Sequence, residues 1–351
     1  MIELKQLQKV YDQQQDAVIK EVTVNILPGE FFVMVGPSGS GKSTILRMIA
    51  GLEPITGGDL IIAGERMNDL PPKARHLSMV FQNYALYPNM TVSENITFGL
   101  KARKVASATQ LQRLSDALAL VGLADYAYRY PRELSGGQRQ RVALARSIVS
   151  GAEIILMDEP LSNLDAQLRE SMRYEIKALQ RKLGITVVYV THDQTEAMTM
   201  RDRVMILNDG VVQQIGTPMQ LYELPANTFV AKFFGTPQMN VLTAVTDWKN
   251  QGVAIDTPFD PDAMVGIRPE AARLNPENAD DMAIEFWVAT ATQIGSETLL
   301  FGTINGREET LQFKISGHLD VPAEQFITLY IPRNALHYFD LNGNMLATVG
   351  V

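Results

Sequence analysis

The sequence predicts an α/β fold whose core carries an all-helical insertion, followed by a small all-β domain. Apolar runs typical of buried parallel strands lie at 31–35, 154–157 and 186–190, and helical patterns separate them. Helical periodicity dominates from about 86 to 150. Beyond about residue 240, short alternating segments are separated by turn pairs such as Asn305-Gly306 and Asn342-Gly343. We therefore expect domains at 1–235 and 236–351, with a boundary at 236–240.

Length and composition support two domains and exclude several classes of protein. At 351 residues the chain exceeds what one compact core normally supports. A formal net charge of −8 argues against a large nucleic-acid footprint. The chain has no cysteine, which agrees with a reducing cytoplasm. It shows no signal-peptide pattern and no apolar run near the ~20 residues that span a bilayer. We expect a protein that is soluble or held at a membrane by partners.

Residues 36–44 match the pattern G-x-x-x-x-G-K-[ST] at every fixed position, between a predicted strand and a predicted helix. Glycines are needed where a Cβ would block the turn or the approach of a phosphate to backbone N–H groups. The helix that follows directs its N-terminal dipole at the same anion. We expect Lys42 to contact the β- and γ-phosphates and Ser43 to ligate Mg²⁺. The expected nucleotide contacts here are Gly36, Ser38, Gly39, Ser40, Gly41, Lys42, Ser43 and Thr44.

Two further strands of this core are expected to end in catalytic side chains. The buried run 154–157 leads into Asp158 and Glu159, and the carboxyl ends of such strands are where doubly wound sheets bind ligands. Asp158 would hold Mg²⁺ and Glu159 would polarise the attacking water. The alternative is that the two acids only cap the next helix. His192 follows the run 186–190, where a third catalytic strand would end.

Two other features have alternative interpretations. Tyr11 follows the first predicted strand, and beside a phosphate loop its ring could stack on an adenine, although a lone exposed tyrosine usually has no such function. Ser135, Gly136 and Gly137 begin a predicted helix. They form either a simple N-cap or a second phosphate-binding helix N-terminus, and the residues alone do not decide between the two. Leu111, Leu114, Leu118 and Val121 form a helical stripe that predicts a core face.

Together these motifs resemble the nucleotide-binding subunit of ABC transporters over about residues 1–235. Gln82 matches the glutamine loop of that family, and 134–138 matches its signature in full. Asp165 ends a segment, 162–165, that resembles the loop communicating across the dimer, and His192 resembles the switch histidine. The signature favours phosphate binding by Ser135, Gly136, Gly137 and Gln138.

The C-terminal segment resembles a narrower group. Residues 265–270 and 295–297 are similar to hallmarks of the OB-like (TOBE) regulatory domain of the maltose-importer ATPases. That group energises bacterial uptake of sugars, oligosaccharides and glycerol-3-phosphate. The resemblance thus implies a P-loop NTPase core of the ABC type, a helical subdomain at about 86–150 and a regulatory β-domain at 236–351.

The resemblance also implies a mechanism and partners. Two subunits, identical or paralogous, face each other head to tail and hold ATP and Mg²⁺ between them. Glu159, His192, Gln82 and Lys42 would be catalytic, and Mg²⁺ would be held by Ser43, Gln82 and Asp158. The subunit would lie at the cytoplasmic face of the membrane on two transmembrane permease subunits, indirectly served by an extracellular solute-binding protein, with no nucleic-acid partner.

The loop after Gln82 is the candidate contact with the permease. Leu86, Tyr87 and Met90 are apolar residues that we expect to form a socket for a permease helix. The alternative is that they pack inside the helical subdomain.

The rival function is a soluble ABC ATPase acting on nucleic acid or ribosomes. Such proteins generally carry two nucleotide domains or long coiled coils, whereas this chain has one such domain and no long heptad tract. A purely regulatory nucleotide binder is disfavoured because Glu159 and His192 are both present.

Overall fold

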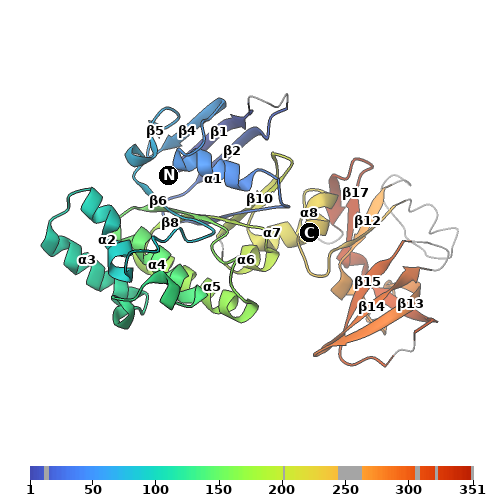
Figure 1. Ribbon diagram of the computed structural model, residues 1–351. Helices are drawn as coiled ribbons and strands as arrows, with labels where there is room; N and C mark the ends of the chain where they lie inside the picture. The colour runs from blue at the N-terminus through green and yellow to red at the C-terminus, as the bar shows by residue number, and fades with distance from the viewer. Residues whose placement is uncertain (12–15, 201, 244–262, 305–308, 321–322, 349–351) are drawn as a thin grey trace. The chain divides into compact units, whose positions relative to one another are not determined.

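The computed structural model describes residues 1–11, 16–200, 202–243, 263–304, 309–320 and 323–348. It divides the chain into two compact units, Met1–Pro218 and Met219–Val351. Figure 1 shows the elements in chain order. The strands of the first unit are β1 (Ile2–Lys9), β2 (Ile19–Ile26), β3 (Phe31–Val35), β4 (Gly57–Ile62), β5 (Glu65–Arg66), β6 (Leu77–Val80), β7 (Ile154–Asp158), β8 (Thr186–Thr191), β9 (Arg203–Asn208) and β10 (Val211–Gly216).

The central sheet of the first unit confirms the predicted α/β core. Its strand order is β10-β9-β3-β8-β7-β6, and β3 pairs in parallel with both β8 and β9. β7 likewise runs parallel to β6 and β8. Every residue of β3, β7 and β8 is buried, as expected of strands covered on both faces. The carboxyl ends of these three strands therefore lie at the same edge of the sheet.

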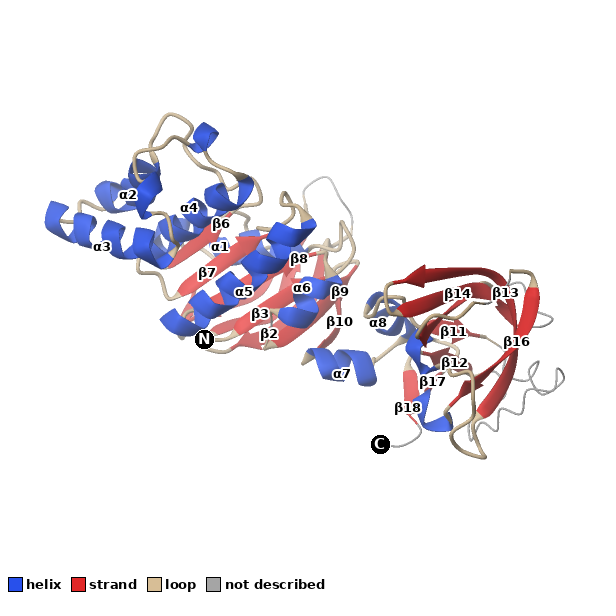
Figure 2. Ribbon diagram, turned by 90° about the horizontal axis from the view of Figure 1, so that it is seen from below, coloured by secondary structure: helices blue, strands red, loops and turns tan. Residues whose placement is uncertain are grey.

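Helices and a second sheet cover the two faces of this core. The helices of the first unit are α1 (Lys42–Ala50), α2 (Val92–Ala102), α3 (Ser107–Leu120), α4 (Gly136–Val149), α5 (Ala166–Leu183) and α6 (Gln194–Thr199). The antiparallel sheet β2-β1-β4-β5 shares one hydrophobic core with α1 and with β3, β7 and β8. Figure 2 shows α5 and α6 on the other face of the central sheet. The phosphate-loop helix α1 is thus packed between two sheets.

The helical insertion between β6 and β7 is confirmed. It contains α2, α3 and α4, which pack around a separate core that includes Val92, Ile96 and Val142. One expectation about its core is wrong. Leu118 and Val121 of the predicted stripe are buried, but Leu111 is 68% exposed. α3 buries only its C-terminal half against α4, so the stripe extends past the end of the interface.

The second unit is rich in strands but also contains helices. Its elements are α7 (Pro218–Glu223), which begins at the unit boundary, α8 (Thr228–Phe233), β11 (Asn240–Leu242), β12 (Met264–Ile267), β13 (Met282–Ile294), β14 (Glu297–Ile304), β15 (Leu311–Ser316), β16 (Gln325–Ile331), β17 (Leu336–Phe339) and β18 (Met345–Thr348). The sheets β11-β12-β17-β18 and β15-β14-β13-β16 share one apolar core. The predicted turn at Asn305-Gly306 lies outside the described residues, and Gly343 turns with a φ of 83°.

The compact unit begins at Met219, earlier than the boundary expected at 236–240. Arg268 explains the difference. Its guanidinium, beside β12, donates to the carbonyls of Tyr222, Ala231 and Phe234 at 2.5, 3.1 and 2.6 Å, and its Cζ lies 3.9 Å from the centre of the Tyr222 ring. Sequence patterning shows the change to alternating strands but not these tertiary bonds. Within the part of the chain that the structure describes, no helix is both long and apolar enough to cross a membrane.

Candidate active site

The phosphate loop connects β3 to α1, and its glycines have distinct structural requirements. A Cβ at Gly36 would lie 2.0 Å from the Leu207 carbonyl oxygen, and a Cβ at Gly41 would lie 2.3 Å from a methyl of Ile19. Gly39 has open space around it but a φ of 83°, which side chains disfavour. Glycine is therefore required by close packing against neighbouring residues at Gly36 and Gly41, and by a positive φ at Gly39 and Gly41.

Lys42, the first residue of α1, folds back over the loop. Its Nζ donates to the carbonyl oxygens of Gly36 (2.9 Å) and Pro37 (2.7 Å) and to Ser40 Oγ (3.2 Å). Burial lowers the pKa of Lys42, while the nearby carboxylates of Glu159 and Asp158 act in the opposite direction. Its ammonium is therefore a cation placed directly at the mouth of the loop. Ser38 is exposed and Thr44 half-buried beside it.

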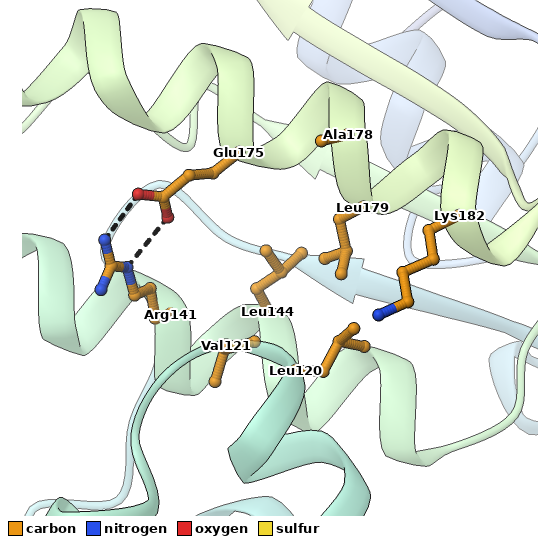
Figure 3. Close-up of a pocket in the computed structure, with 8 residues that line it drawn as sticks. All are labelled: Leu120, Val121, Arg141, Leu144, Glu175, Ala178, Leu179 and Lys182. Carbon is orange, nitrogen blue, oxygen red and sulfur yellow. Dashed lines mark hydrogen bonds and ion pairs between the residues drawn. The ribbon is translucent and has the colours of Figure 1, made fainter.

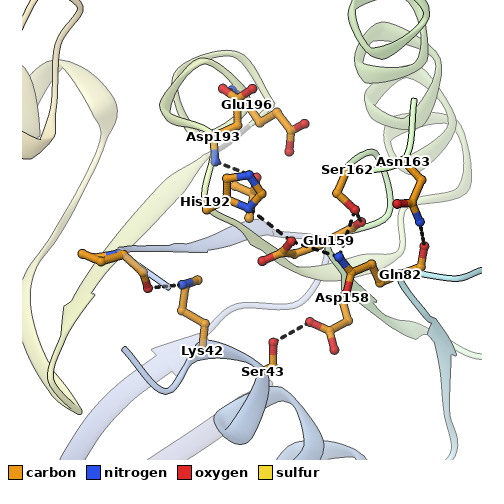
Figure 4. Close-up of polar contacts among 12 residues, drawn as sticks. Lys42, Ser43, Gln82, Asp158, Glu159, Ser162, Asn163, His192, Asp193 and Glu196 are labelled. Carbon is orange, nitrogen blue, oxygen red and sulfur yellow. Dashed lines mark hydrogen bonds and ion pairs between the residues drawn. The ribbon is translucent and has the colours of Figure 1, made fainter. Parts of the chain in front are cut away.

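Ser43 and Asp158 meet at the edge of the sheet, although they are far apart in sequence. Ser43 Oγ donates to Asp158 Oδ1 at 2.7 Å, and Asp158 is buried at the end of β7. Figure 4 shows this pair below Glu159 and beside Lys42. The hydroxyl and the carboxylate form a pair of hard oxygen donors facing one point, which is the arrangement that the motif spacing predicts.

Glu159 is the centre of a polar cluster. His192 Nδ1 lies 3.1 Å from Glu159 Oε2, and Gln82 Nε2 approaches the same oxygen at 3.4 Å. The backbone N–H of Glu159 donates to the Val190 carbonyl at 3.0 Å, which extends the β7–β8 pairing past the end of β7. Glu159 has a φ of 45°, a conformation that residues with a Cβ rarely adopt and that is often found at functional sites. The structure thus brings together the three side chains predicted from separate motifs.

Two neighbours of Gln82 were not assigned this position from sequence. Ser162 Oγ accepts from Gln82 Nε2 at 3.3 Å, and Asn163 Nδ2 donates to the Gln82 carbonyl at 2.9 Å. Both belong to the segment 162–165, whose position directly after Glu159 was the available signal. Asp165 lies at the end of that segment and caps α5 by accepting from the Leu168 N–H at 2.9 Å.

The signature segment forms the N-terminus of α4, outside the cluster drawn in Figure 4. Ser135 and Gln138 form a capping box: Ser135 Oγ accepts from the Gln138 N–H, and the Ser135 N–H donates to Gln138 Oε1. A Cβ at Gly136 or Gly137 would lie 3.0 Å from Leu164 or Leu168. The glycines therefore also allow the 162–165 segment and the start of α5 to pack closely against α4.

Tyr11 follows β1 and is half-buried. Lys9 Nζ lies 4.6 Å from the centre of the Tyr11 ring, and it also bonds to Glu53 at 2.7 Å and to the Pro54 carbonyl at 3.0 Å. The start of β2, which pairs with Lys9, contacts Gly41 of the phosphate loop through Ile19. The ring is thus attached to a strand pair that leads directly to the loop.

A hollow of about 290 Å³ lies beside the segment that follows Gln82. Tyr87 and Phe98 line it with rings 4.5 Å apart, and they are 40% and 38% exposed. Of the residues expected to form a socket, Leu86 instead packs against the helical core, as the alternative interpretation has it. Met90 is half-buried and is absent from the wall of this hollow. Phe98 was missed because its helical periodicity looks like that of any partly buried position.

A different hollow, of about 350 Å³, lies between the end of α3 and the facing sides of α4 and α5 (Figure 3). It is lined by Leu120, Leu144 and other apolar side chains, and Arg141 pairs with Glu175 at its edge at 2.6 Å. It contains none of the residues of the phosphate loop or the strand ends. This hollow is therefore separate from the predicted catalytic residues at the sheet edge.

Comparisons with known proteins agree with this geometry. A family described as ABC transporter matches residues 19–162. The chain is 47% identical over 354 residues to the uncharacterized ABC transporter ATP-binding protein YcjV of Escherichia coli UTI89, covering 97% of both chains. It is 45% identical to the sn-glycerol-3-phosphate import ATP-binding protein UgpC of Vibrio vulnificus, covering 97% of this chain and 93% of that one.

A solved structure supports the fold of the first unit. The ATP-binding cassette MJ0796, in a dimeric post-hydrolysis state bound to ADP and Pi, is 35% identical, with a TM-score of 0.55. The match covers 62% of this chain and 98% of that one. Given the identity shared with full-length relatives, the chain belongs to the ATP-binding proteins of ABC transporters and is an ATPase of that type.

Proposed function

We propose that this chain is the ATP-hydrolysing subunit of a bacterial ABC importer for a carbohydrate-type solute, meaning a sugar, an oligosaccharide or glycerol-3-phosphate. The observation that carries the proposal is the convergence of the phosphate loop with Asp158, Glu159 and His192 at one sheet edge. The UgpC relatives are named for sn-glycerol-3-phosphate import and support the class of solute.

The phosphate loop explains how the γ-phosphate is held. Lys42 Nζ uses its three donors on Gly36, Pro37 and Ser40, and phosphate oxygens would replace these acceptors. This change of partners requires little movement of the lysine side chain, because the side chain is flexible and already lies at the loop. The N-terminus of α1 adds its dipole to the same anion.

The residues at the sheet edge fit Mg²⁺. This ion prefers oxygen ligands and usually combines one or two protein ligands with phosphates and water. Ser43 and Asp158 supply such a pair, and no group of three His, Cys, Asp or Glu side chains forms a closed metal site within the described ranges. Gln82 faces Glu159 here, and we assign it as the third ligand from its motif. When bound, Mg²⁺ would neutralise charge on the β- and γ-phosphates.

Glu159 is the group that would orient and polarise the attacking water. Its carboxylate is held by His192 at 3.1 Å, and its side chain is only partly exposed. His192 is half-exposed, so its other ring nitrogen has room to contact the γ-phosphate. In this proposal the Glu159 carboxylate accepts the proton, and His192 and Gln82 position the reacting groups.

Among the described residues, the signature N-terminus does not join the phosphate loop of its own chain, and this favours a dimer. The signature N-terminus on α4 has the backbone N–H groups of Gly136 and Gly137 and a helix dipole to offer, but lies outside the cluster around Lys42. In a head-to-tail pair, identical or paralogous, the signature of one chain would complete the phosphate site of the other. The relative MJ0796 is dimeric in its ADP-bound structure, which supports this arrangement.

The remaining assignments concern partners and regulation. The hollow lined by Tyr87 and Phe98 would receive a helix from one of two permease subunits, which would hold the chain at the cytoplasmic face of the membrane. A solute-binding protein would act on the permease from the other side. The second unit would be the OB-like regulatory domain, which extends from Met219 by the contacts of Arg268.

The proposal is tested by purification and uptake. The chain is expected to co-purify with membranes only when its permease is co-expressed, and disruption of its gene should abolish uptake of one carbohydrate-type solute. Radiolabelled sn-glycerol-3-phosphate and maltooligosaccharides serve as the two probes. Association with ribosomes or nucleic acid, with uptake of both probes unchanged, would instead identify a soluble ABC ATPase.

Tyr11 provides a separate prediction about the adenine. If its ring stacks on the base, Tyr11→Ala should weaken ATP binding by about 1–3 kcal/mol, the range for base–aromatic stacking. Tyr11→Trp should bind like the unaltered chain because it keeps a π-face, and Lys9 can still lie against that ring. Equilibrium binding of ATP measures both variants. Equal losses for alanine and tryptophan would mean that the ring does not stack on adenine.

A further inference from the structure

The turn after Gln82 has a backbone that must be held in place. Tyr84 and Ala85 have φ values of 62° and 46°, so two consecutive residues with side chains lie in the left-handed region. The Tyr84 N–H donates to the Phe81 carbonyl at 2.8 Å and closes the turn around Gln82. Ala85 is exposed, so core packing of its own side chain does not explain its conformation.

Arg146 supplies the contacts that hold this turn. Its Nη1 donates to the Ala85 carbonyl and its Nη2 to the Tyr84 carbonyl, both at 2.7 Å. Arg146 lies on α4, the helix that begins with the signature. A planar guanidinium presents two N–H groups on separate nitrogens in a fixed geometry to two neighbouring acceptors, whereas a lysine ammonium would have to serve both from one nitrogen on a flexible side chain.

The two carbonyls are the principal partners of this guanidinium. Among the described residues, no carboxylate lies within ion-pair distance of Arg146, and burial lowers its pKa. A half-buried cation without an acidic partner depends on hydrogen bonds to replace the water it has lost. Arg146 and the left-handed turn therefore stabilise each other.

Gln82 connects this turn to the chemistry. Its amide approaches Glu159 Oε2 at 3.4 Å and Ser162 Oγ at 3.3 Å, and its carbonyl accepts from Asn163 at 2.9 Å. The direction that its side chain takes is set by the backbone between Phe81 and Ala85. Whatever fixes Tyr84 and Ala85 thus fixes Gln82 against Glu159.

We infer that Arg146 is a positioning residue for ATP hydrolysis, which holds the left-handed turn and so places Gln82 beside Glu159. Arg146 also lines the hollow that contains Tyr87 and Phe98. Phe81 and Ala85 of the turn line it as well, so an occupant of that hollow would touch both the turn and the guanidinium that holds it. The inference rests on the proposed hydrolytic roles of Gln82 and Glu159.

Kinetics of the full chain test the positioning role. Arg146→Lys is expected to lower kcat for ATP about 10- to 100-fold, the size of loss that misplacement of a positioned group by about 1 Å causes. The KM for ATP should change by less than about twofold, because Arg146 does not contact the phosphate loop. Arg103→Lys is the matched control, since Arg103 lines the same hollow but donates to the Ser150 carbonyl and not to the turn.

Substitutions at Ala85 separate positioning from general stability. Ala85→Gly should restore part of kcat in the Arg146→Lys chain, because glycine adopts a positive φ without the penalty. Ala85→Val should lower kcat with Arg146 intact, because a β-branched residue opposes the same φ. If Arg146→Lys does not fold, the valine variant still tests whether the conformation of the turn controls kcat.

Three results would overturn the inference: unchanged kcat in Arg146→Lys, an equal loss in Arg103→Lys, or no effect of either substitution at Ala85. Failure of the proposed function is distinguishable from these. If Glu159→Gln retains normal turnover, the hydrolytic roles are wrong. If Glu159→Gln is inactive while Arg146→Lys is fully active, only the role of Arg146 is wrong.

The link to the hollow has its own test, because the chain contains no cysteine and one introduced thiol is modified selectively. Labelling Phe98→Cys with N-ethylmaleimide should change kcat when Arg146 is present and not in the Arg146→Lys chain. Labelling Leu111→Cys, an exposed site on α3, is the control and should change neither. Equal changes in both chains, or none in either, would exclude a link through Arg146.

Discussion

Glu159→Gln is expected to lower the ATP turnover number by about 100- to 10,000-fold, the usual contribution of a general base, while ATP still binds. The amide keeps the size and hydrogen-bonding capacity of the side chain but cannot accept a proton from water at neutral pH. Lys42, Ser43 and Asp158 are untouched, so the phosphates retain their contacts. Phosphate release measures turnover, and equilibrium binding of ATP measures the occupied site.

The same variant should trap a dimer in the presence of ATP and Mg²⁺, because the γ-phosphate that would join the two chains in the proposed arrangement is no longer removed. Size-exclusion chromatography with and without ATP detects it. Glu170→Gln is the matched control, since Glu170 is an exposed residue of α5 and should behave like the unaltered chain. Turnover near the normal rate in Glu159→Gln would mean that another group activates the water.

The sequence predicts the catalytic strands well because their residue pattern is set by burial on both faces. β3, β7 and β8 all lie where the apolar runs indicate. The parallel order then brings Ser43 to Asp158 and Glu159 to His192, since strand ends meet at one edge. These contacts follow from the topology of the sheet, so they can be predicted from the sequence motifs.

Contacts made by backbone carbonyls cannot be predicted from sequence motifs in the same way. Arg146 appears in the sequence as one more charged residue on a helix, and its two acceptors depend on an unusual turn far away in the chain. Arg268 similarly extends the second unit to Met219 by bonding to carbonyls of α7 and α8. Any residue can supply a carbonyl, so no sequence pattern marks such partners.

The proposed permease socket gives the second large expected effect, and Tyr87 is the position to change. The Tyr87 backbone is held at both ends by Asn95, which donates to its carbonyl at 3.1 Å and accepts from its N–H at 2.8 Å. Its ring is 40% exposed and packs on Phe98. Substitution of the side chain therefore leaves the path of the loop intact.

Tyr87→Glu is expected to abolish docking of the permease and uptake of solute while the isolated chain stays folded and binds ATP. Loss of the ring pair should cost about 0.5–1.5 kcal/mol of stability. The new charge should add little to this cost in the isolated chain, because it remains in water until a partner covers it. Ile96→Glu provides the contrast, since Ile96 is fully buried in the helical core and an unpaired charge there should cost about 3 kcal/mol or more. Tyr87→Phe keeps the ring and should retain both docking and uptake. Thermal melts measure the stability of the variants, and a permease pull-down measures docking. A melting temperature for Tyr87→Glu as low as that of Ile96→Glu would show that Tyr87 is not part of a socket. Normal docking of Tyr87→Glu would show the same.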